Sequence, residues 1–265
     1  MSGISGLSPI PMYETYIKNE ASYAQKAAKA DPATQTALTY FEKTAPTLTT
    51  PQALLKNYRV LQVVLDAFGM GGMINEQGIL KQLMTQNPAS PQSLVQRMSN
   101  PTYLNFAKVM ANWNPPPFSN AQTMASMMQN YMTNQFEVSA NQQNPGMQAA
   151  LYFTRNIGAV TSIPELMSDN TLLNVVETNL GLPMQFGLLN YSQQVSILSK
   201  GVDLKNFQSP SYVNTYVQKF LALTQENGGG SGSGSATSSP LVNLIGGGTS
   251  GFSSGTSDPL VNLIA

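Results

Sequence analysis

The sequence predicts an all-α domain of about ten short to medium helices, followed by a Gly/Ser-rich tail. Apolar residues recur three and four positions apart, and the alternation typical of strands is nowhere convincing. A capping residue followed by proline marks candidate helix starts at Asp31-Pro32, Thr50-Pro51, Ser90-Pro91, Asn100-Pro101, Asn144-Pro145 and Ser209-Pro210. This pair is typical of helix starts, because the cap side chain accepts an orphan amide and proline has no amide to leave unpaired.

The first elements follow from these faces. The spacing from Tyr13 through Ile17 to Ala24 predicts a first helix. The next strong pattern runs from Leu54 to Phe68 and is apolar nearly all round, so we expect that helix to be the buried centre of the domain. Gly69 is expected to end it.

The later helices are predicted in the same way. They are centred on residues 79–84, 94–98, 104–110, 124–136, 147–157, 172–180, 195–198 and 213–221. Gly181 is expected to end the helix that contains Leu180.

The domain organisation follows from breaks and composition. Residues 1–8 are expected to be a disordered N-terminus and 9–227 the helical domain, with a candidate subdivision near 114–119 at Pro115-Pro116-Pro117. Residues 228–265 are mostly Gly, Ser and Thr, which bury too little apolar surface to offset chain entropy. We therefore expect a disordered tail.

Composition removes several function classes. Charged residues make up 10% of the chain, the net charge is zero, and there is no His or Cys. Imidazole and thiolate catalysis, disulfides and nearly all zinc, copper and haem sites are thereby excluded. No basic patch favours nucleic acid. The sequence predicts a non-enzymatic protein with no catalytic residues, cofactor or metal.

Two aromatic or sulfur-rich features have a packing interpretation and a binding alternative. Met124, Met127, Met128 and Met132 form a stripe that suits core filling, or an adaptable binding face. Trp113 beside the triple proline is expected to pack over a helix end, the alternative being a recognition surface.

The few charges suggest ion pairs. Arg59 with Asp66 and Arg155 with Glu137 are the candidates. Glu137 with Glu177 could form an acid–base pair, but nothing in the sequence places these two carboxylates together, so this alternative is disfavoured.

The tail contains one apolar hexamer twice, Pro240–Ile245 and Pro259–Ile264, with differing flanks. We interpret the copies as docking peptides for a protein partner, which would add a strand to a sheet edge or place a short helix in a groove. The alternative is a duplication relic. The candidate partner-binding residues are Leu241, Val242, Asn243, Leu244, Ile245, Leu260, Val261, Asn262, Leu263 and Ile264.

Several separated blocks carry a family resemblance. They include Leu54–Leu61, Asp66–Met70, Asn87–Ser93, Tyr131–Val138 and Leu180–Pro183. Across roughly residues 31–225 the chain resembles an uncharacterised alphaproteobacterial domain-of-unknown-function family commonly encoded among flagellar genes. The resemblance implies an all-α fold and a flagellar gene neighbourhood, and it brings no catalytic residues.

The leading hypothesis is a non-enzymatic flagellum-associated protein, either an assembly factor or an exported structural component. The alternative is a cytoplasmic helical adaptor that uses its tail hexamers as docking peptides. The expected partner is a flagellar or export protein, not nucleic acid, and the oligomeric state stays open. Residues 1–12 do not resemble a Sec signal peptide and no stretch approaches a membrane span, so we expect a cytoplasmic location or export through the flagellar apparatus.

Overall fold

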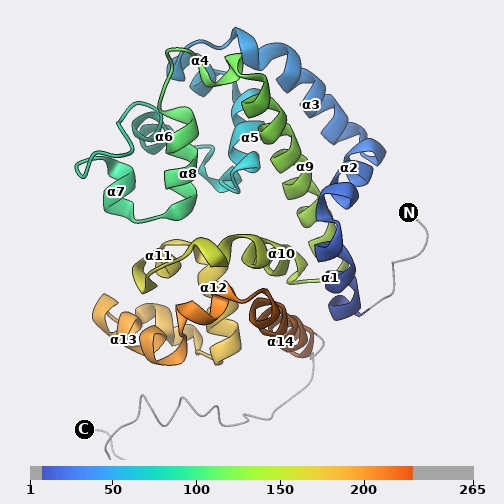
Figure 1. The fold of residues 1–265 in the computed structure, drawn as a ribbon, viewed down its shortest axis with the longest axis vertical. Helices are drawn as coiled ribbons and strands as arrows, with labels where there is room; N and C mark the ends of the chain where they lie inside the picture. The colour runs from blue at the N-terminus through green and yellow to red at the C-terminus, as the bar shows by residue number, and fades with distance from the viewer. Residues whose placement is uncertain (1–7, 229–265) are drawn as a thin grey trace, which may run out of the picture. The chain divides into compact units, whose positions relative to one another are not determined.

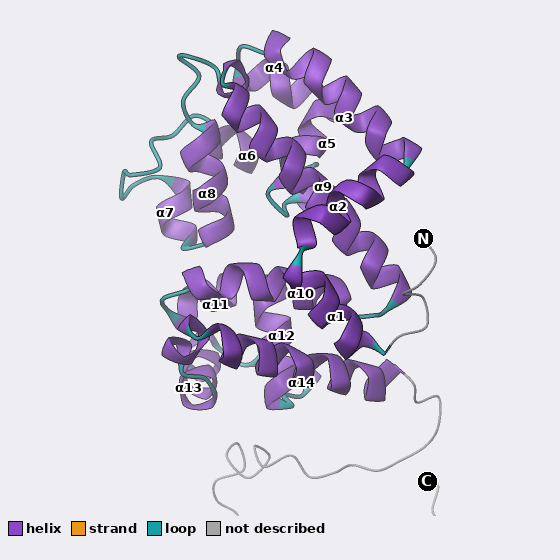
Figure 2. Cartoon of the chain, turned by 45° about the vertical axis from the view of Figure 1, so that its right-hand side comes forward, coloured by secondary structure: helices purple, strands orange, loops and turns teal. Residues whose placement is uncertain are grey.

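The structure is a computed structural model that describes residues 8–228 (Figure 1). In these residues helices joined by loops are the regular structure and there is no strand, as Figure 2 shows, so the all-α prediction is confirmed. The α-helices are α1 (Pro9–Lys18), α2 (Glu20–Ala30), α3 (Pro32–Thr44), α4 (Pro51–Lys56), α5 (Tyr58–Ala67), α6 (Gln77–Leu83), α7 (Leu94–Met98), α8 (Pro101–Met110), α9 (Ala121–Gln143), α10 (Met147–Asn156), α11 (Ile163–Ser168), α12 (Asn170–Leu180), α13 (Tyr191–Gly201) and α14 (Pro210–Gly228). Within the described range, no helix is both long and apolar enough to cross a bilayer.

Short 3-10 helices connect several of these elements. They are η1 (Ala45–Thr47), η2 (Gly71–Met73), η3 (Pro117–Ser119), η4 (Ile157–Ala159), η5 (Met184–Leu188) and η6 (Leu204–Gln208).

Two apolar clusters form the interior of this helical body. The α5 cluster is centred on Leu61, Val64 and Leu65 and is built by α3–α8 with the first half of α9. The α10 cluster is centred on Leu151 and Phe153 and is built by α1, α2, the second half of α9 and α10–α14. The predicted burial of the 54–68 region is confirmed for α5, whose Val60, Leu61 and Val64 are fully buried.

Helix α9 belongs to both clusters. Its Met127 and Tyr131 pack in the α5 cluster, whereas Phe136 and Ala140 pack in the α10 cluster. Helices α2 and α5 both pack along α9 (Figure 1). The clusters thus separate within α9, between Tyr131 and Phe136, and not at the proline run, which lies between α8 and α9.

Four of the six cap–proline pairs start helices as predicted. Asp31 accepts hydrogen bonds from the amides of Ala33 and Thr34, and Thr50 and Asn100 cap α4 and α8 in the same way. The fourth pair, Ser209-Pro210, directly precedes and begins α14.

The other two pairs form turns, and the prediction of helix starts there is wrong. Asn144 accepts a hydrogen bond from the Met147 amide, and Gly146 between them has a φ of 89°, so Pro145 occupies a tight turn before α10. Around Pro91, the amides of Ser90 and Ser93 bond back to Asn87 and Ser90, which delays α7 to Leu94.

Two predicted helices are each split at an asparagine. Asn19, at φ −156°, separates α1 from α2, so α1 packs against α10 and α14 while α2 packs along α9. Asn57 separates α4 from α5 and caps α5 through the Val60 amide. Tyr58, predicted on the buried face, is consequently 55% exposed. At Asn57 the side chain favours the break by accepting a hydrogen bond from the nearby Val60 amide, whereas the Asn19 side chain makes no capping hydrogen bond.

Both predicted glycine stops are confirmed. Gly69 and Gly181 have φ values of 70° and 62°. After α5 the Met70 amide bonds to the Leu65 carbonyl, and after α12 the Leu182 amide bonds to the Glu177 carbonyl, as in a Schellman motif.

The methionine stripe and Trp113 pack as predicted. Met127 is buried in the α5 cluster, and Met124 and Met128 pack against it, while Met132 packs against the α10 cluster. Trp113 lies edge-on to Phe118 at a centroid distance of 5.9 Å. The expectations for the N-terminal residues before Ser8 and for the tail after Gly228 lie outside the described residues.

Candidate functional site

A cleft of about 330 Å³, lined mostly by polar residues, lies along α9. Elements of the α5 cluster and of the α10 cluster both contribute to its lining. We call it the polar cleft. Its lining includes Glu20 from α2, Asp66 and Gly69 from the end of α5, Thr102 and Asn105 from α8, Gln129, Asn130, Thr133 and Asn134 from α9, and Tyr152, Arg155 and Asn156 from α10.

Arg155 joins three helices at one edge of the polar cleft. Its Nη1 donates to Glu137 on α9 and lies 3.3 Å from Oε2 of Glu20 on α2. The predicted Arg155–Glu137 pair is confirmed, and it joins a carboxylate that is 1% exposed to a guanidinium side chain that is 40% exposed. Breaking such a pair would leave an uncompensated buried charge.

The protonation of Glu137 is set by two opposing effects. Burial raises its pKa to about 7, while the hydrogen bond and charge of Arg155 oppose the rise. The Glu137 carboxyl therefore titrates near neutral pH, whereas an ordinary glutamate is already ionised there.

Tyr152, one turn before Arg155 on α10, is the centre of a second polar group in the same cleft. Its hydroxyl donates to Oδ2 of Asp169 at 2.8 Å and lies 3.0 Å from Oγ1 of Thr102. Asp169 also caps α12 through the amides of Thr171 and Leu172. Burial, and then the Asp169 charge, raise the pKa of Tyr152, so this phenol stays protonated at physiological pH. These contacts tie α8, α10 and α12 together.

The predicted Arg59–Asp66 ion pair is wrong for these described residues. The Arg59 guanidinium instead lies 3.9 Å from the ring centroid of Tyr40. Asp66 accepts hydrogen bonds from Gln62 at 2.8 Å and Gln135 at 3.4 Å, and burial raises its pKa. Asp66 thus binds side-chain amides, which fit a carboxyl in either protonation state better than a fixed cation would.

The acid–base alternative finds no support in the contacts of its two members. Glu137 bonds to Arg155, whereas Glu177 lies on α12 and its pKa is raised by burial alone. In the described residues no hydrogen bond or shared cavity joins them.

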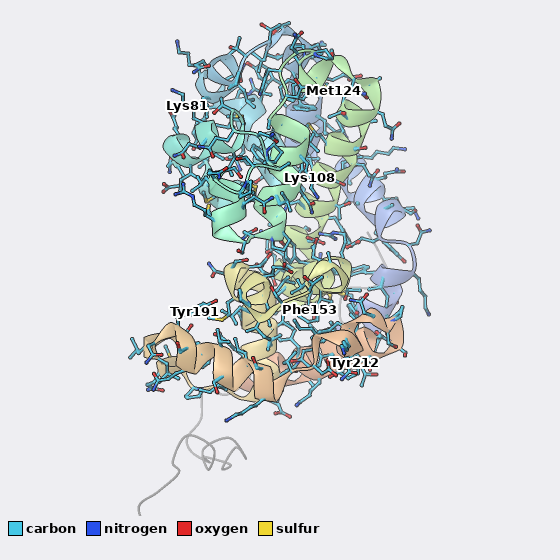
Figure 3. All side chains as sticks on the ribbon, turned by 60° about the vertical axis from the view of Figure 1, so that its left-hand side comes forward. Lys81, Lys108, Met124, Phe153, Tyr191 and Tyr212 are labelled. Atoms are coloured by element: carbon cyan, nitrogen blue, oxygen red, sulfur yellow. The ribbon has the colours of Figure 1, made fainter. Side chains whose placement is uncertain are left out.

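A second feature, not predicted from the sequence, is an exposed apolar surface at η5 and the start of α13. Met184 is 97% exposed, Leu188 85% and Tyr191 60%. Val195, one turn after Tyr191, is partly exposed and continues the same face. We call these four residues the η5–α13 surface; Figure 3 labels Tyr191 on it.

Buried packing and side-chain hydrogen bonds fix the backbone of the η5–α13 surface. Phe186 is buried in the α10 cluster, so its side chain packs η5 onto the body. The Gln194 side chain donates to the carbonyls of Phe186, Gly187 and Leu189, and Asn190 with Gln193 forms a capping box at the start of α13. Apolar side chains on a pre-ordered turn lose little entropy on binding, which suits a docking surface.

A family model now places the chain. The model described as a protein of unknown function, DUF1217, matches residues 67–213, more than half of the sequence. The chain belongs to the DUF1217 family. The match confirms the resemblance to a family of unknown function.

A solved structure shares this DUF1217 fold. The crystal structure of protein AGR_C_984 from Agrobacterium tumefaciens superposes with a TM-score of 0.70 at 18% identity, covering 83% of this chain and 93% of that chain. At that identity the likeness concerns the fold alone. A search of curated proteins finds no match.

The DUF1217 match contains most of the features described above. Glu137, Tyr152, Arg155, Asp169 and the η5–α13 surface lie inside residues 67–213, whereas Glu20 and Asp66 lie outside. The ten predicted tail residues, Leu241 to Ile245 and Leu260 to Ile264, lie outside both the family match and the described residues.

The sequence held a signal for the η5–α13 surface. The stretch from Thr178 to Ser199 contains no charged residue but several large apolar ones. After Gly181 the apolar spacing placed only Val195 and Leu198 in a helix and assigned no role to Met184, Leu188 or Tyr191, because a short 3-10 turn has no 3.6-residue periodicity.

Proposed function

We propose that this DUF1217 protein is a non-enzymatic, protein-binding component of the flagellar system, either an assembly factor or an exported structural component. The observation that carries the protein-binding part is the η5–α13 surface, where Met184, Leu188 and Tyr191 are exposed on a pre-ordered turn. The flagellar part rests on the family's gene neighbourhood.

A protein is the partner that this surface suits best. Apolar side chains without nearby charge favour burial against another apolar surface. The stretch Thr178–Ser199 offers no cation for phosphates, so nucleic acid and anionic lipid headgroups are poor matches. Met184 and Tyr191 are residue types enriched at protein interfaces.

The buried carboxylates support a non-catalytic role. Glu137 is paired with Arg155, Asp169 caps α12 and accepts from Tyr152, and Asp66 accepts from two glutamines. Each of these groups has a stabilising role in packing the helices, which accounts for its presence without a reaction.

Deletion and complementation in the parent bacterium test the proposal. We expect cells that lack the gene to swim less and to carry fewer or shorter filaments, and we expect wild-type protein to restore them. A Met184→Ser/Leu188→Ser protein should restore less, whereas Tyr58→Ser, which alters an exposed aromatic elsewhere, should restore fully. Normal filaments and swimming in the deletion strain would overturn the proposal.

A second candidate is a cytoplasmic adaptor. It is favoured by the presence of two separate apolar binding elements, the η5–α13 surface on the body and the hexamers beyond Gly228. Fractionation into cytoplasm, membrane, sheared flagella and culture medium separates the two. Recovery only from cytoplasm favours the adaptor, and recovery from flagella or medium favours the exported component.

A further inference from the structure

The η5–α13 surface and the tail hexamers have matching chemistry. The surface lies in a stretch, Thr178–Ser199, without a charged residue. Each hexamer, Pro-Leu-Val-Asn-Leu-Ile, is also uncharged and carries four aliphatic side chains. A charged peptide would lose hydration on this surface without gaining an ion pair, so an uncharged aliphatic peptide is the better occupant.

We infer that the η5–α13 surface binds the hexamer of a second copy of this chain, so that the protein self-associates through tail-to-body contacts. The inference rests on the proposed function only in treating this surface as a docking site. It names the occupant that the proposed function leaves open.

Both hexamers follow a sequence signal that the body uses to start helices. Ser239-Pro240 and Asp258-Pro259 repeat the cap–proline pattern of Asp31-Pro32, Thr50-Pro51, Asn100-Pro101 and Ser209-Pro210. Proline at the first helical position after a Ser or Asp cap favours a helical turn. Ser90-Pro91 and Asn144-Pro145 show that the pattern also forms turns, so the short helix is the bound form that we take for the inference, not one that the pattern alone fixes.

The geometry of such a helix fits the surface. In the first hexamer Leu241, Leu244 and Ile245 would share one face, and Asn243 would point away toward water. A six-residue helix is about 9 Å long. Tyr191 and Val195 lie one turn apart on α13, about 6 Å along its axis, and Leu188 is the last residue of η5, three positions before that helix.

The number of hexamers favours association between chains. The chain carries two copies, and within residues 8–228 one ordered surface of this kind is exposed. Each chain therefore has a spare hexamer whatever the first one binds.

Sedimentation velocity of the purified full chain tests this at protein concentrations from about 1 μM to about 1 mM. That range covers the dissociation constants that we expect for a short apolar peptide. We expect the mean mass of wild type to rise with concentration. A surface variant, Leu188→Ser/Tyr191→Ser, and a tail variant, Leu241→Ser/Ile245→Ser/Leu260→Ser/Ile264→Ser, should each bind at least about tenfold more weakly. Tyr58→Ser, an exposed aromatic outside the surface, should behave as wild type.

Mixing the two variants gives the sharpest result. The surface variant still carries hexamers and the tail variant still carries a surface, so an equimolar mixture should form pairs that neither forms alone. The tail variant leaves the body unchanged, so its result does not depend on the folding of a body variant.

Three outcomes overturn the inference. They are a wild type that stays monomeric over the whole range, a tail variant that associates as wild type does, and a mixture that stays monomeric. The second would mean that the surface pairs with another copy of itself. Because the measurement uses purified protein, it is independent of swimming, and the flagellar proposal can fail while self-association holds, or the reverse.

Discussion

Glu137 places a carboxyl in the interior, where its protonation is linked to folding. Its pKa is raised from an ordinary value of 4.5 to about 7 by burial, against the opposing effect of Arg155. Between these two values the folded protein holds a proton that the unfolded chain has lost. The folded state is therefore favoured below about pH 4.5, and this contribution is lost as the pH rises through about 7.

This linkage predicts a pH-dependent difference between wild type and Glu137→Gln. Relative to the variant, the free energy of unfolding of wild type should fall by on the order of 3 kcal/mol as the pH rises from about 4.5 to about 8. Urea denaturation across that range measures it. Glu42→Gln, at an exposed position, is the control for the loss of one carboxyl group at the surface. A flat difference for Glu137→Gln would contradict the assignment.

Substitutions of Leu61 and Leu188 compare the stability contribution of a buried leucine with that of an exposed one. Leu61 is fully buried in the α5 cluster, whereas Leu188 is 85% exposed. Leu61→Ala should cost about 2–5 kcal/mol, because it removes buried contacts and leaves a cavity. Leu188→Ala should change stability by less than about 0.5 kcal/mol. Urea denaturation at a low protein concentration tests both, and a large loss for Leu188→Ala would mean that its side chain is part of the core.

At the scale of elements, the glycine stops can be tested against an unconstrained glycine. Gly181 ends α12 at a φ of 62°, where a Cβ is strained, so Gly181→Ala should destabilise by about 1 kcal/mol. Gly78 lies inside α6, where an added Cβ meets nothing within 4 Å, so Gly78→Ala should stabilise by about 0.5–1 kcal/mol. Opposite signs in thermal and urea unfolding are the expected result, and equal signs would contradict the capping argument.

The elements also show what the sequence could predict. Capping chemistry predicted where α3, α4, α8 and α14 begin and where α5 and α12 end, since those signals act over a few residues. The splits at Asn19 and Asn57 were missed because the apolar spacing continues across both breaks. The split at Asn19 lets α1 and α2 pack against different neighbours, and the split at Asn57 lets α4 pack against α6 while α5 packs along α9. These are tertiary effects that periodicity does not contain.

The candidate site was predicted in part. The Arg155–Glu137 pair follows from the scarcity of charge in the chain, since a buried carboxylate needs a cation and few are present. The Arg59–Asp66 pair failed although the two residues lie on one helix. Arg59 lies over the ring of Tyr40 on α3, and Asp66 accepts from Gln62 of its own helix and from Gln135 on α9. The exposure of Met184 and Leu188 depends on which side of a short turn faces the core, and spacing does not determine that.

At the scale of the whole body, α9 is the element that both apolar clusters share. Its first half packs in the α5 cluster and its second half in the α10 cluster, and Arg155 adds a polar link from α10 to α9 and α2. A continuous helix transmits unfolding of one half to the other, because fraying one cluster removes the packing that holds the next turns of α9. We therefore expect the two clusters to unfold in a single transition in the wild-type protein.

Proline substitution within α9 should remove this coupling. Thr133→Pro lies between Tyr131 and Phe136, where the clusters separate; it deletes a helical amide and clashes with the preceding turn, at a cost of at least about 3 kcal/mol. Calorimetry should then resolve two transitions, one for each cluster. Gln122→Pro, in the first turn of the same helix, is the matched control and should leave one transition near the wild-type temperature, because proline is tolerated there. A single, merely lowered transition for Thr133→Pro would mean that contacts other than α9, such as those of Asn100 with Ser168 and Tyr152 with Thr102, suffice to couple the two clusters.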